Sequence, residues 1–206
     1  GYRSTWWERL YMDATYYYSW YSDFIGYHLG LRIEDDPGGS AADRLRGVQA
    51  YRIASNATQQ VTTQGFSIGS NYYFSRYTLA ANYTWNVLNS GEDDPIIPAY
   101  NTPEHKYNVS FAGRDLNWRL GKGRSGFMAS YKWVEGFLFE GSPQFTGRIP
   151  SYSLVDAQVS WASPDQHWLL KLGSSNLLNR PVVQVYGGPA VGRLSYLSLV
   201  WDMPNT

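Results

Sequence analysis

The chain has 206 residues with 17 basic and 17 acidic side chains, a balance that argues against nucleic acid or another polyanion as its partner. It contains no cysteine, which excludes a disulfide scaffold and thiol catalysis. Its mean hydropathy is −0.41 and no apolar run approaches the roughly 18 residues of a spanning helix, so a helical membrane protein is excluded, whereas a membrane barrel of half-apolar strands is not.

The N-terminal half alternates apolar and polar side chains with the period of a β-strand. The sequence starts at Gly1 with neither an initiator methionine nor a signal peptide, so we expect a processed chain or a piece of a longer one. After a strand end and a turn at 5–8, the pattern predicts a strand over 10–25, a long loop over 26–47, and a long strand over 48–74, bulged near Asn56 or Gly65. A tight turn at Ser75-Arg76 leads into the most regular strand, over 77–87.

The C-terminal half continues the alternation in shorter segments. A second long loop over 88–105, a basic turn over 114–124, a third loop over 140–150, a turn at 163–166 and a fourth loop over about 178–192 separate the predicted strands. Those strands cover 107–111, 127–133, 155–161, 168–172 and the final Ser195–Met203. The whole chain thus predicts about nine antiparallel strands joined alternately by short turns and long loops, as in outer-membrane barrels.

Tyrosine and tryptophan are abundant, and both favour the boundary between a membrane and water. If the last strand ends in the periplasm, three tryptophans fall at one level, as a lipid-facing girdle requires: Trp161, Trp168 and Trp201. The charged strand residues face the lumen instead, where we expect lateral pairing: Lys132, Asp156, Lys171 and Asp202. The alternative, a soluble β-sandwich or small barrel, would pack Val, Ile and Leu on strands of about five or six residues.

Four segments of the sequence together resemble one known family of proteins. They are the aromatic stretch 16–25; Tyr51-Arg52 with Asn56-Ala57 and Thr63-Gln64-Gly65-Phe66; Ser175-Asn176-Leu177-Leu178-Asn179-Arg180; and Tyr186-Gly187-Gly188-Pro189 with Gly192-Arg193. In their order and spacing they resemble the C-terminal part of a TonB-dependent outer-membrane receptor of the kind common in Bacteroidetes. The likeness runs over nearly all of the chain, but it departs at the end, where Asp202–Thr206 follow Trp201 in place of a terminal aromatic residue.

The resemblance implies an all-β, transmembrane, antiparallel up-and-down barrel of about 22 strands with a plugged lumen. Residues 1–206 would be one domain supplying about nine C-terminal strands, an incomplete barrel whose plug domain and N-terminal strands lie outside this sequence. It also implies the outer membrane of a Gram-negative bacterium and import of a scarce solute energised by TonB. The expected partners are membrane lipid, the remaining strands and plug, TonB, and an outer-membrane lipoprotein or larger complex, with no cofactor and no nucleic acid.

Catalytic and metal chemistry receive little support from the sequence. The histidines His28, His105 and His167 fall in predicted loops or turns and no G-x-S-x-G elbow is present, so we expect no enzyme and no catalytic residue. Two acidic clusters in the long loops are weak calcium candidates without EF-hand spacing: Glu34, Asp35, Asp36, Glu92, Asp93 and Asp94. The function classes that stay open are a transporter, a structural or interaction component of a larger outer-membrane complex, and, least favoured, an outer-membrane enzyme.

Overall fold

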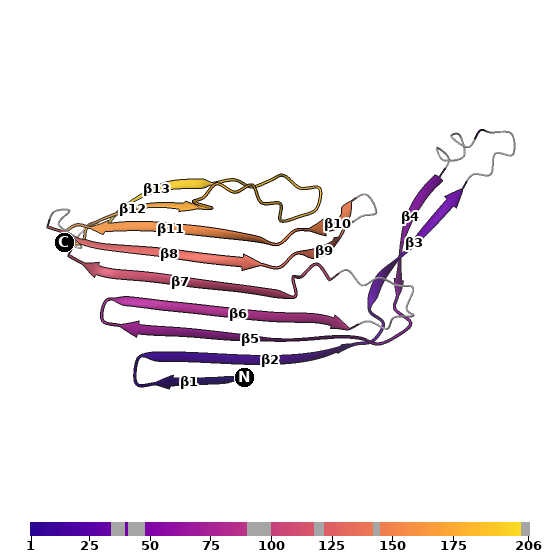
Figure 1. The fold of residues 1–206 in the computed structure, drawn as a ribbon, viewed down its shortest axis with the longest axis horizontal. Coiled ribbons are helices and arrows are strands. Elements are labelled where there is room, and N and C mark those ends of the chain that lie inside the picture. The colour runs from indigo at the N-terminus through magenta and orange to yellow at the C-terminus, as the bar shows by residue number, and fades with distance from the viewer. Residues whose placement is uncertain (34–39, 41–47, 90–99, 118–121, 142–144, 203–206) are drawn as a thin grey trace.

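The computed structural model describes residues 1–33, 40, 48–89, 100–117, 122–141 and 145–202 (Figure 1). Within these ranges the chain forms thirteen β-strands. Among the same residues, no helix is long and apolar enough to span a membrane. Nine of the strands make one antiparallel sheet in the order β1-β2-β5-β6-β7-β8-β11-β12-β13, which confirms the predicted all-β architecture and its approximate strand number.

The strands of this main sheet are long because their alternating pattern runs on without a breaker. Their bounds are β1 Tyr2–Trp6, β2 Leu10–Tyr21, β5 Val61–Phe74, β6 Tyr77–Asn89, β7 His105–Leu116, β8 Arg124–Val134, β11 Tyr152–Ala162, β12 Trp168–Ser175 and β13 Leu194–Trp201. The turns after β1, β5, β7 and β11 gather at one end of the sheet, here called the turn end (Figure 1). Ser75 has a φ of 56°, the left-handed conformation that a two-residue turn needs, so the tight turn predicted there is confirmed.

Two small hairpins stand at the opposite end, here called the loop end (Figure 1). β3 (Ile25–Ile33) pairs with β4 (Val48–Asn56), and β9 (Phe137–Glu140) pairs with β10 (Thr146–Ile149). Three expectations are therefore wrong: 26–47 is not all loop, 48–74 is two strands in different sheets, and 140–150 contains hairpin strands. The alternation could not mark these boundaries, because a hairpin that leaves the sheet keeps the same period of two.

The main sheet has one apolar and one polar face, and the pairing register keeps each set in line across the strands. Leu172 of β12 lies opposite Leu197 of β13 and Val159 of β11, and the same row continues to Phe127 of β8. Large side chains of the apolar face are exposed, up to 70% for Leu197. This distribution of side chains is the reverse of that in a soluble protein, in which large apolar side chains form the core.

The polar face is built from small and hydrogen-bonding side chains. Gly69 leaves the space that the carboxylate of Asp13 occupies on the neighbouring strand, since a side chain at that glycine would collide with it. Tyr196 crosses over Gly173 in the same way and donates a hydrogen bond from its hydroxyl to Oε1 of Gln158, 2.7 Å away. The Asp13 contact joins β2 to β5, and the Tyr196 contacts tie β11, β12 and β13 together on the polar side.

Aromatic rings form two rows on the apolar face, one towards each end of the strands. Near the turn end, Phe74, Tyr77 and Phe111 stack with centroids 5.6–6.1 Å apart. Near the loop end, Tyr107 stacks on Trp133 at 5.4 Å, while Phe66 contacts Trp85 at 5.6 Å. The residues between the rows are mostly aliphatic or small. Two aromatic rows around an apolar band are typical of a barrel wall in a membrane.

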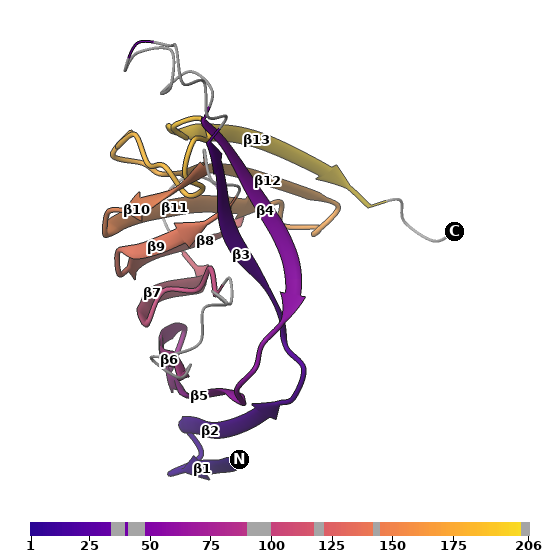
Figure 2. The same ribbon diagram turned by 90° about the vertical axis from the view of Figure 1, so that its right-hand side faces the viewer.

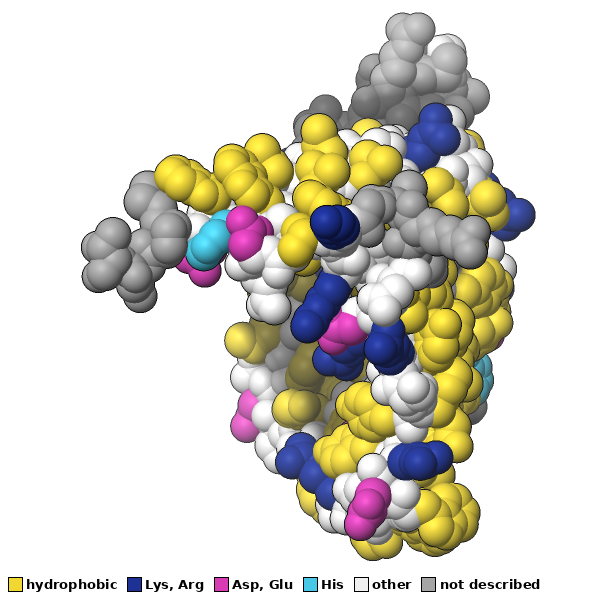
Figure 3. Space-filling view, turned by 90° about the vertical axis from the view of Figure 1, so that its left-hand side faces the viewer, with side chains coloured by type: hydrophobic (Ala, Val, Ile, Leu, Met, Phe, Trp, Pro, Cys, Tyr) yellow, Lys and Arg dark blue, Asp and Glu magenta, His cyan; other side chains and the backbone are white. Residues whose placement is uncertain are grey.

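The sheet curves but does not close in the described part of the chain. β1 and β13 are its two edges and do not pair with each other. Seen from the loop end, the strands follow an arc and the β3–β4 hairpin crosses its open side (Figure 2). Seen from the turn end, hydrophobic side chains gather along the outside of the arc, whereas Lys and Arg side chains gather near the turns (Figure 3).

Candidate functional site

A pocket of about 490 Å³ lies at the loop end of the sheet. Its wall comes from the end of β6, the segment before β7, the connection after β8, and the β9–β10 hairpin. The lining residues that carry chemistry are Tyr100, Thr102, Glu104, Glu135, Glu140 and Arg148. A pocket of this size with several convergent polar groups is the kind of place where a small molecule binds.

The segment before β7 is fixed to the β9–β10 hairpin by paired hydrogen bonds. The side-chain amide of Asn101 donates to the carbonyl of Glu140 at 3.1 Å, and its oxygen accepts from the Glu140 N–H at 2.7 Å. A hydrogen bond with Tyr17 of β2 holds Tyr100 from the other side, and burial together with this hydrogen bond raises the pKa of its phenol. The pocket wall is therefore joined to both the main sheet and the small hairpin.

Carboxylates dominate the electrostatics of this pocket. Among the described residues, the pocket lining contains three carboxylates, those of Glu104, Glu135 and Glu140, and one guanidinium, that of Arg148. Burial raises the pKa of Glu140, and the Tyr100 N–H and the charge of Arg52 on β4 oppose that rise. Three carboxylates still outnumber the two arginines, Arg148 and Arg52, among the described residues, and this excess favours a cationic ligand over an anionic one.

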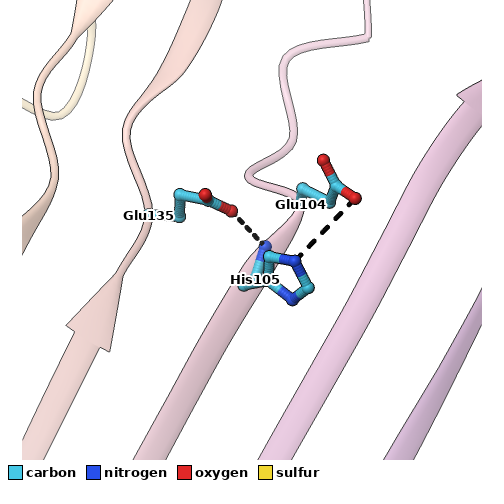
Figure 4. Close-up of side chains that lie close together, drawn as sticks. All are labelled: Glu104, His105 and Glu135. Carbon is cyan, nitrogen blue, oxygen red and sulfur yellow. Dashed lines mark hydrogen bonds and ion pairs between the residues drawn. The ribbon is translucent and has the colours of Figure 1, made fainter.

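Glu104, His105 and Glu135 come together where β7 begins and β8 has just ended (Figure 4). His105 Nε2 lies 3.8 Å from Glu104 Oε1, and the backbone N–H of His105 donates to Glu135 Oε2 at 3.1 Å. The side chains of Glu104 and His105 are 52% and 38% exposed, so both are within reach of solvent. One ligand atom from each of the three residues lies within 4.8 Å of the others, a separation that a metal ion can bridge.

The tryptophans predicted to form a girdle lie near one another at the turn end. Trp168 and Trp201 are paired residues, with rings stacked at 5.7 Å. Trp161 lies opposite Leu170, two residues along β12 from Trp168, and its indole Nε1 is buried without a partner in the described residues. Their contact with lipid stays a prediction.

The charged residues predicted to face the lumen do not form ion pairs with one another in the part of the chain that the structure describes. The register places Lys132, Asp156 and Lys171 on the polar face. Asp156 accepts the backbone N–H of Asn176 at 2.8 Å and so fixes the turn after β12. Asp202 follows β13, and its N–H donates to the carbonyl of His167 at 2.9 Å. The calcium candidates Glu34, Asp35, Asp36, Glu92, Asp93 and Asp94 lie outside the described residues.

The residues of the loop-end pocket were not among the site residues expected from sequence. His105 was expected in a loop but is the first residue of β7, and His28 lies inside β3, whereas His167 does lie in a turn. A usable signal existed: because Lys106 pairs with Val134, the antiparallel register puts His105 beside Glu135. The predicted strands 107–111 and 127–133 did not include a register, so the juxtaposition was missed.

The fold defines the class of protein. A curved antiparallel sheet with long strands, an exposed apolar face between two aromatic rows, and a polar opposite face is part of the wall of an outer-membrane type of β-barrel. The sequence profile of the family described as TonB dependent receptor-like, beta-barrel matches residues 1–177. The chain therefore belongs to the TonB-dependent receptor-like β-barrel family.

Solved structures give the same fold at low sequence identity. The chain is similar to the FrpB iron transporter from Neisseria meningitidis, with a TM-score of 0.63 and 13% identity to the F3-3 variant and 0.65 and 12% to the F5-1 variant. The apoprotein form of the F5-1 variant gives a TM-score of 0.63 and 12% identity. Each match covers 97% of this chain but only 29–30% of the transporter, so the chain spans about three-tenths of the proteins it resembles. No curated protein sequence matches it.

Proposed function

We propose that this chain forms part of the barrel wall of a TonB-dependent receptor that imports a scarce solute across the outer membrane of a Gram-negative bacterium. The observation that carries the proposal is the reversed distribution of side chains, with apolar residues exposed on one face of a curved sheet, in a chain of this family. The apolar face contacts lipid, with Trp161, Trp168 and Trp201 in the girdle near the turn end. The Bacteroidetes kind of receptor rests on the sequence motifs alone.

The polar face turns towards the barrel lumen in this proposal. Its partners there are the plug and the remaining strands of the same receptor, and TonB supplies the energy from the inner membrane. An outer-membrane lipoprotein or a larger complex is a further partner that we expect from the sequence. The loop-end pocket faces the outside of the cell and makes the first contact with the solute. Its excess of carboxylates supports a cationic or metal-containing solute over an anionic one.

The orientation can be tested with single cysteines, because the chain has none of its own. Leu138→Cys on β9 marks the loop end and Gln166→Cys marks the turn between β11 and β12. We expect a membrane-impermeant maleimide to label Leu138→Cys in intact cells, and to label Gln166→Cys only after the outer membrane has been opened. The reverse result would invert the orientation and remove the pocket from the outside of the cell.

The transport role needs its own test. Deletion of the gene for the full-length receptor should abolish growth on a limiting nutrient in a panel of scarce solutes, and deletion of tonB should give the same defect. Complementation with the wild-type gene should restore growth. If the panel shows no defect while the labelling pattern is as expected, the barrel has a structural or interaction role instead of a transport role.

A further inference from the structure

We propose that Glu104, His105 and Glu135 bind a divalent transition-metal ion, such as Zn²⁺, at the outer rim of the barrel wall. The three side chains offer one imidazole nitrogen and two carboxylate oxygens within 4.8 Å of one another (Figure 4). In a tetrahedral zinc site with bonds of about 2.0–2.1 Å, neighbouring ligand atoms are roughly 3.3 Å apart. Small rotations of the two carboxylates would bring the set to that spacing.

The imidazole is already oriented as a metal ligand. Its Nδ1 lies 2.6 Å from the hydroxyl of Tyr83 on β6, and the two rings stack with centroids 6.0 Å apart. When Nδ1–H donates to the Tyr83 oxygen, the lone pair of Nε2 points towards Glu104, which is 3.8 Å away. Metal-binding histidines generally have such a partner on the second ring nitrogen, since it fixes both the tautomer and the orientation of the ring.

Each carboxylate is held by one protein donor. Trp85 Nε1 donates to Glu104 Oε1 at 3.0 Å, and the backbone N–H of His105 donates to Glu135 Oε2. Two backbone hydrogen bonds join β6, β7 and the end of β8 at this level. Asn86 N donates to Glu104 O at 2.9 Å, and Glu135 N donates to His105 O at 3.0 Å. Glu104 Oε1 and Glu135 Oε2 each accept one hydrogen bond, from Trp85 and from His105 respectively, and keep a second lone pair for a metal. Because both side chains are already held, little conformational freedom has to be lost on binding.

The donor set selects the class of ion. One imidazole and two carboxylates suit Zn²⁺, Mn²⁺, Fe²⁺ or Co²⁺, whereas Ca²⁺ and Mg²⁺ prefer oxygen ligands alone. A divalent ion also neutralises the two negative charges that Glu104 and Glu135 place beside Glu140 on the same pocket wall. The proposal goes beyond the import function, because the site would hold an ion whatever solute the receptor carries. The preference for a cationic solute then applies to the pocket without the ion.

Titration of purified full-length receptor with ZnCl₂ in detergent, followed by calorimetry, tests the proposal. Co²⁺ absorption serves as the spectroscopic probe. We expect one Zn²⁺ site from which Ca²⁺ does not displace the bound ion. The affinity for Zn²⁺ should be at least tenfold weaker in both His105→Asn and Glu135→Gln. The matched control is His167→Asn, which removes an exposed turn histidine and should leave binding unchanged. Tyr83→Phe keeps the aromatic ring but removes the partner of Nδ1, and it should weaken binding roughly tenfold.

Folding and site identity are checked in the same samples. The shift of the folded band on unheated gels should be the same for wild type and all variants, and only variants that pass this check are compared. If the wild type and His105→Asn bind Zn²⁺ equally, or the wild type binds only at millimolar concentration, the proposal is overturned. Glu104, His105 and Glu135 would then be rim residues that bind no metal ion.

Discussion

Replacing Leu172 with arginine should destabilise the membrane-inserted receptor strongly, whereas replacing its neighbour Lys171 with glutamine should not. Leu172 lies on the apolar face, 54% exposed and opposite Leu197, and Lys171 lies on the polar face opposite Ser160 and Ser198. The two residues are adjacent in sequence, so they lie on the same strand at nearly the same depth in the membrane. Only the face that they occupy differs.

The free-energy cost of each substitution follows from how deep the residue lies in the apolar band. Trp168 and Trp201, stacked near the turn end, mark one boundary of the apolar band. A rise of about 3.4 Å per residue on a strand tilted by about 40° gives roughly 2.5 Å of depth per residue. Leu170 then lies about 5 Å and Leu172 about 10 Å inside the boundary, close to the midplane of a band about 25 Å tall. Arginine should cost ~2–4 kcal/mol at Leu172, about 1–2 at Leu170, and Lys171→Gln less than ~0.5 kcal/mol.

Urea titration of the full-length receptor folded into phospholipid vesicles measures these costs through tryptophan fluorescence. Ser130→Arg is the second control, because it places the same arginine on the polar face opposite Asp156. The urea concentration at the unfolding midpoint should be highest for Lys171→Gln, lower for Leu170→Arg and lowest for Leu172→Arg. Equal losses for Leu172→Arg and Ser130→Arg, or a larger loss for Leu170→Arg than for Leu172→Arg, would refute the assignment of faces and depth.

Two further predictions concern turns at opposite ends of the sheet. Asn176, buried with a φ of 50°, bonds Arg180 through both side-chain atoms; Asn176→Ala should therefore cost ~1–3 kcal/mol and open the 177–193 loop to chymotrypsin. At the turn end, the Ser163 hydroxyl and then the His167 N–H hold the pKa of Asp165 below its ordinary value. Such a carboxylate stabilises the turn above its unfolded pKa of about 3.9 and loses the effect as pH falls through the lower folded value. Amide exchange at Trp168 should speed up over that acid range in the wild type but be insensitive to pH, after correction for intrinsic exchange, in Asp165→Asn.

The sequence predicts the main sheet well because its physical cause is local. Each spanning strand alternates apolar and polar side chains along its whole length, and β6, the most regular, extends only two residues beyond the predicted end at 87. The β3–β4 and β9–β10 hairpins escape prediction for the opposite reason. They lie beyond the apolar band, where no membrane imposes a face. Turn residues therefore led us to expect loops over 26–47 and 140–150, and β4 was joined to β5 in one predicted strand over 48–74.

The loop-end pocket depends on contacts that sequence spacing does not contain. Tyr17 and Tyr100 are 83 positions apart, yet a hydrogen bond joins them, because β2, β5 and β6 bring the start of the chain beside the segment before β7. The group of Glu104, His105 and Glu135 depends on less, because the β7–β8 pairing register alone makes His105 and Glu135 neighbours. A register for the predicted strands would have sufficed to find it, whereas the rest of the pocket required the strand order of the main sheet and the β9–β10 hairpin.

The two edges of the sheet lead to the last prediction. β13 pairs through all eight of its residues with β12, and no described strand pairs with its other side. Unpaired N–H and C=O groups in hydrocarbon cost several kcal/mol each, since no water is present to satisfy them. We therefore expect β13 to pair with a strand outside residues 1–206 in the natural receptor, and β1 to pair with another.

An experimental structure of the full-length receptor in lipid would decide this, with Leu197 and Leu199 facing the acyl chains. Direct pairing of β13 with β1 would contradict the prediction. It would also close a barrel of nine strands, too narrow to hold a plug, and the proposed transport function would fail with it.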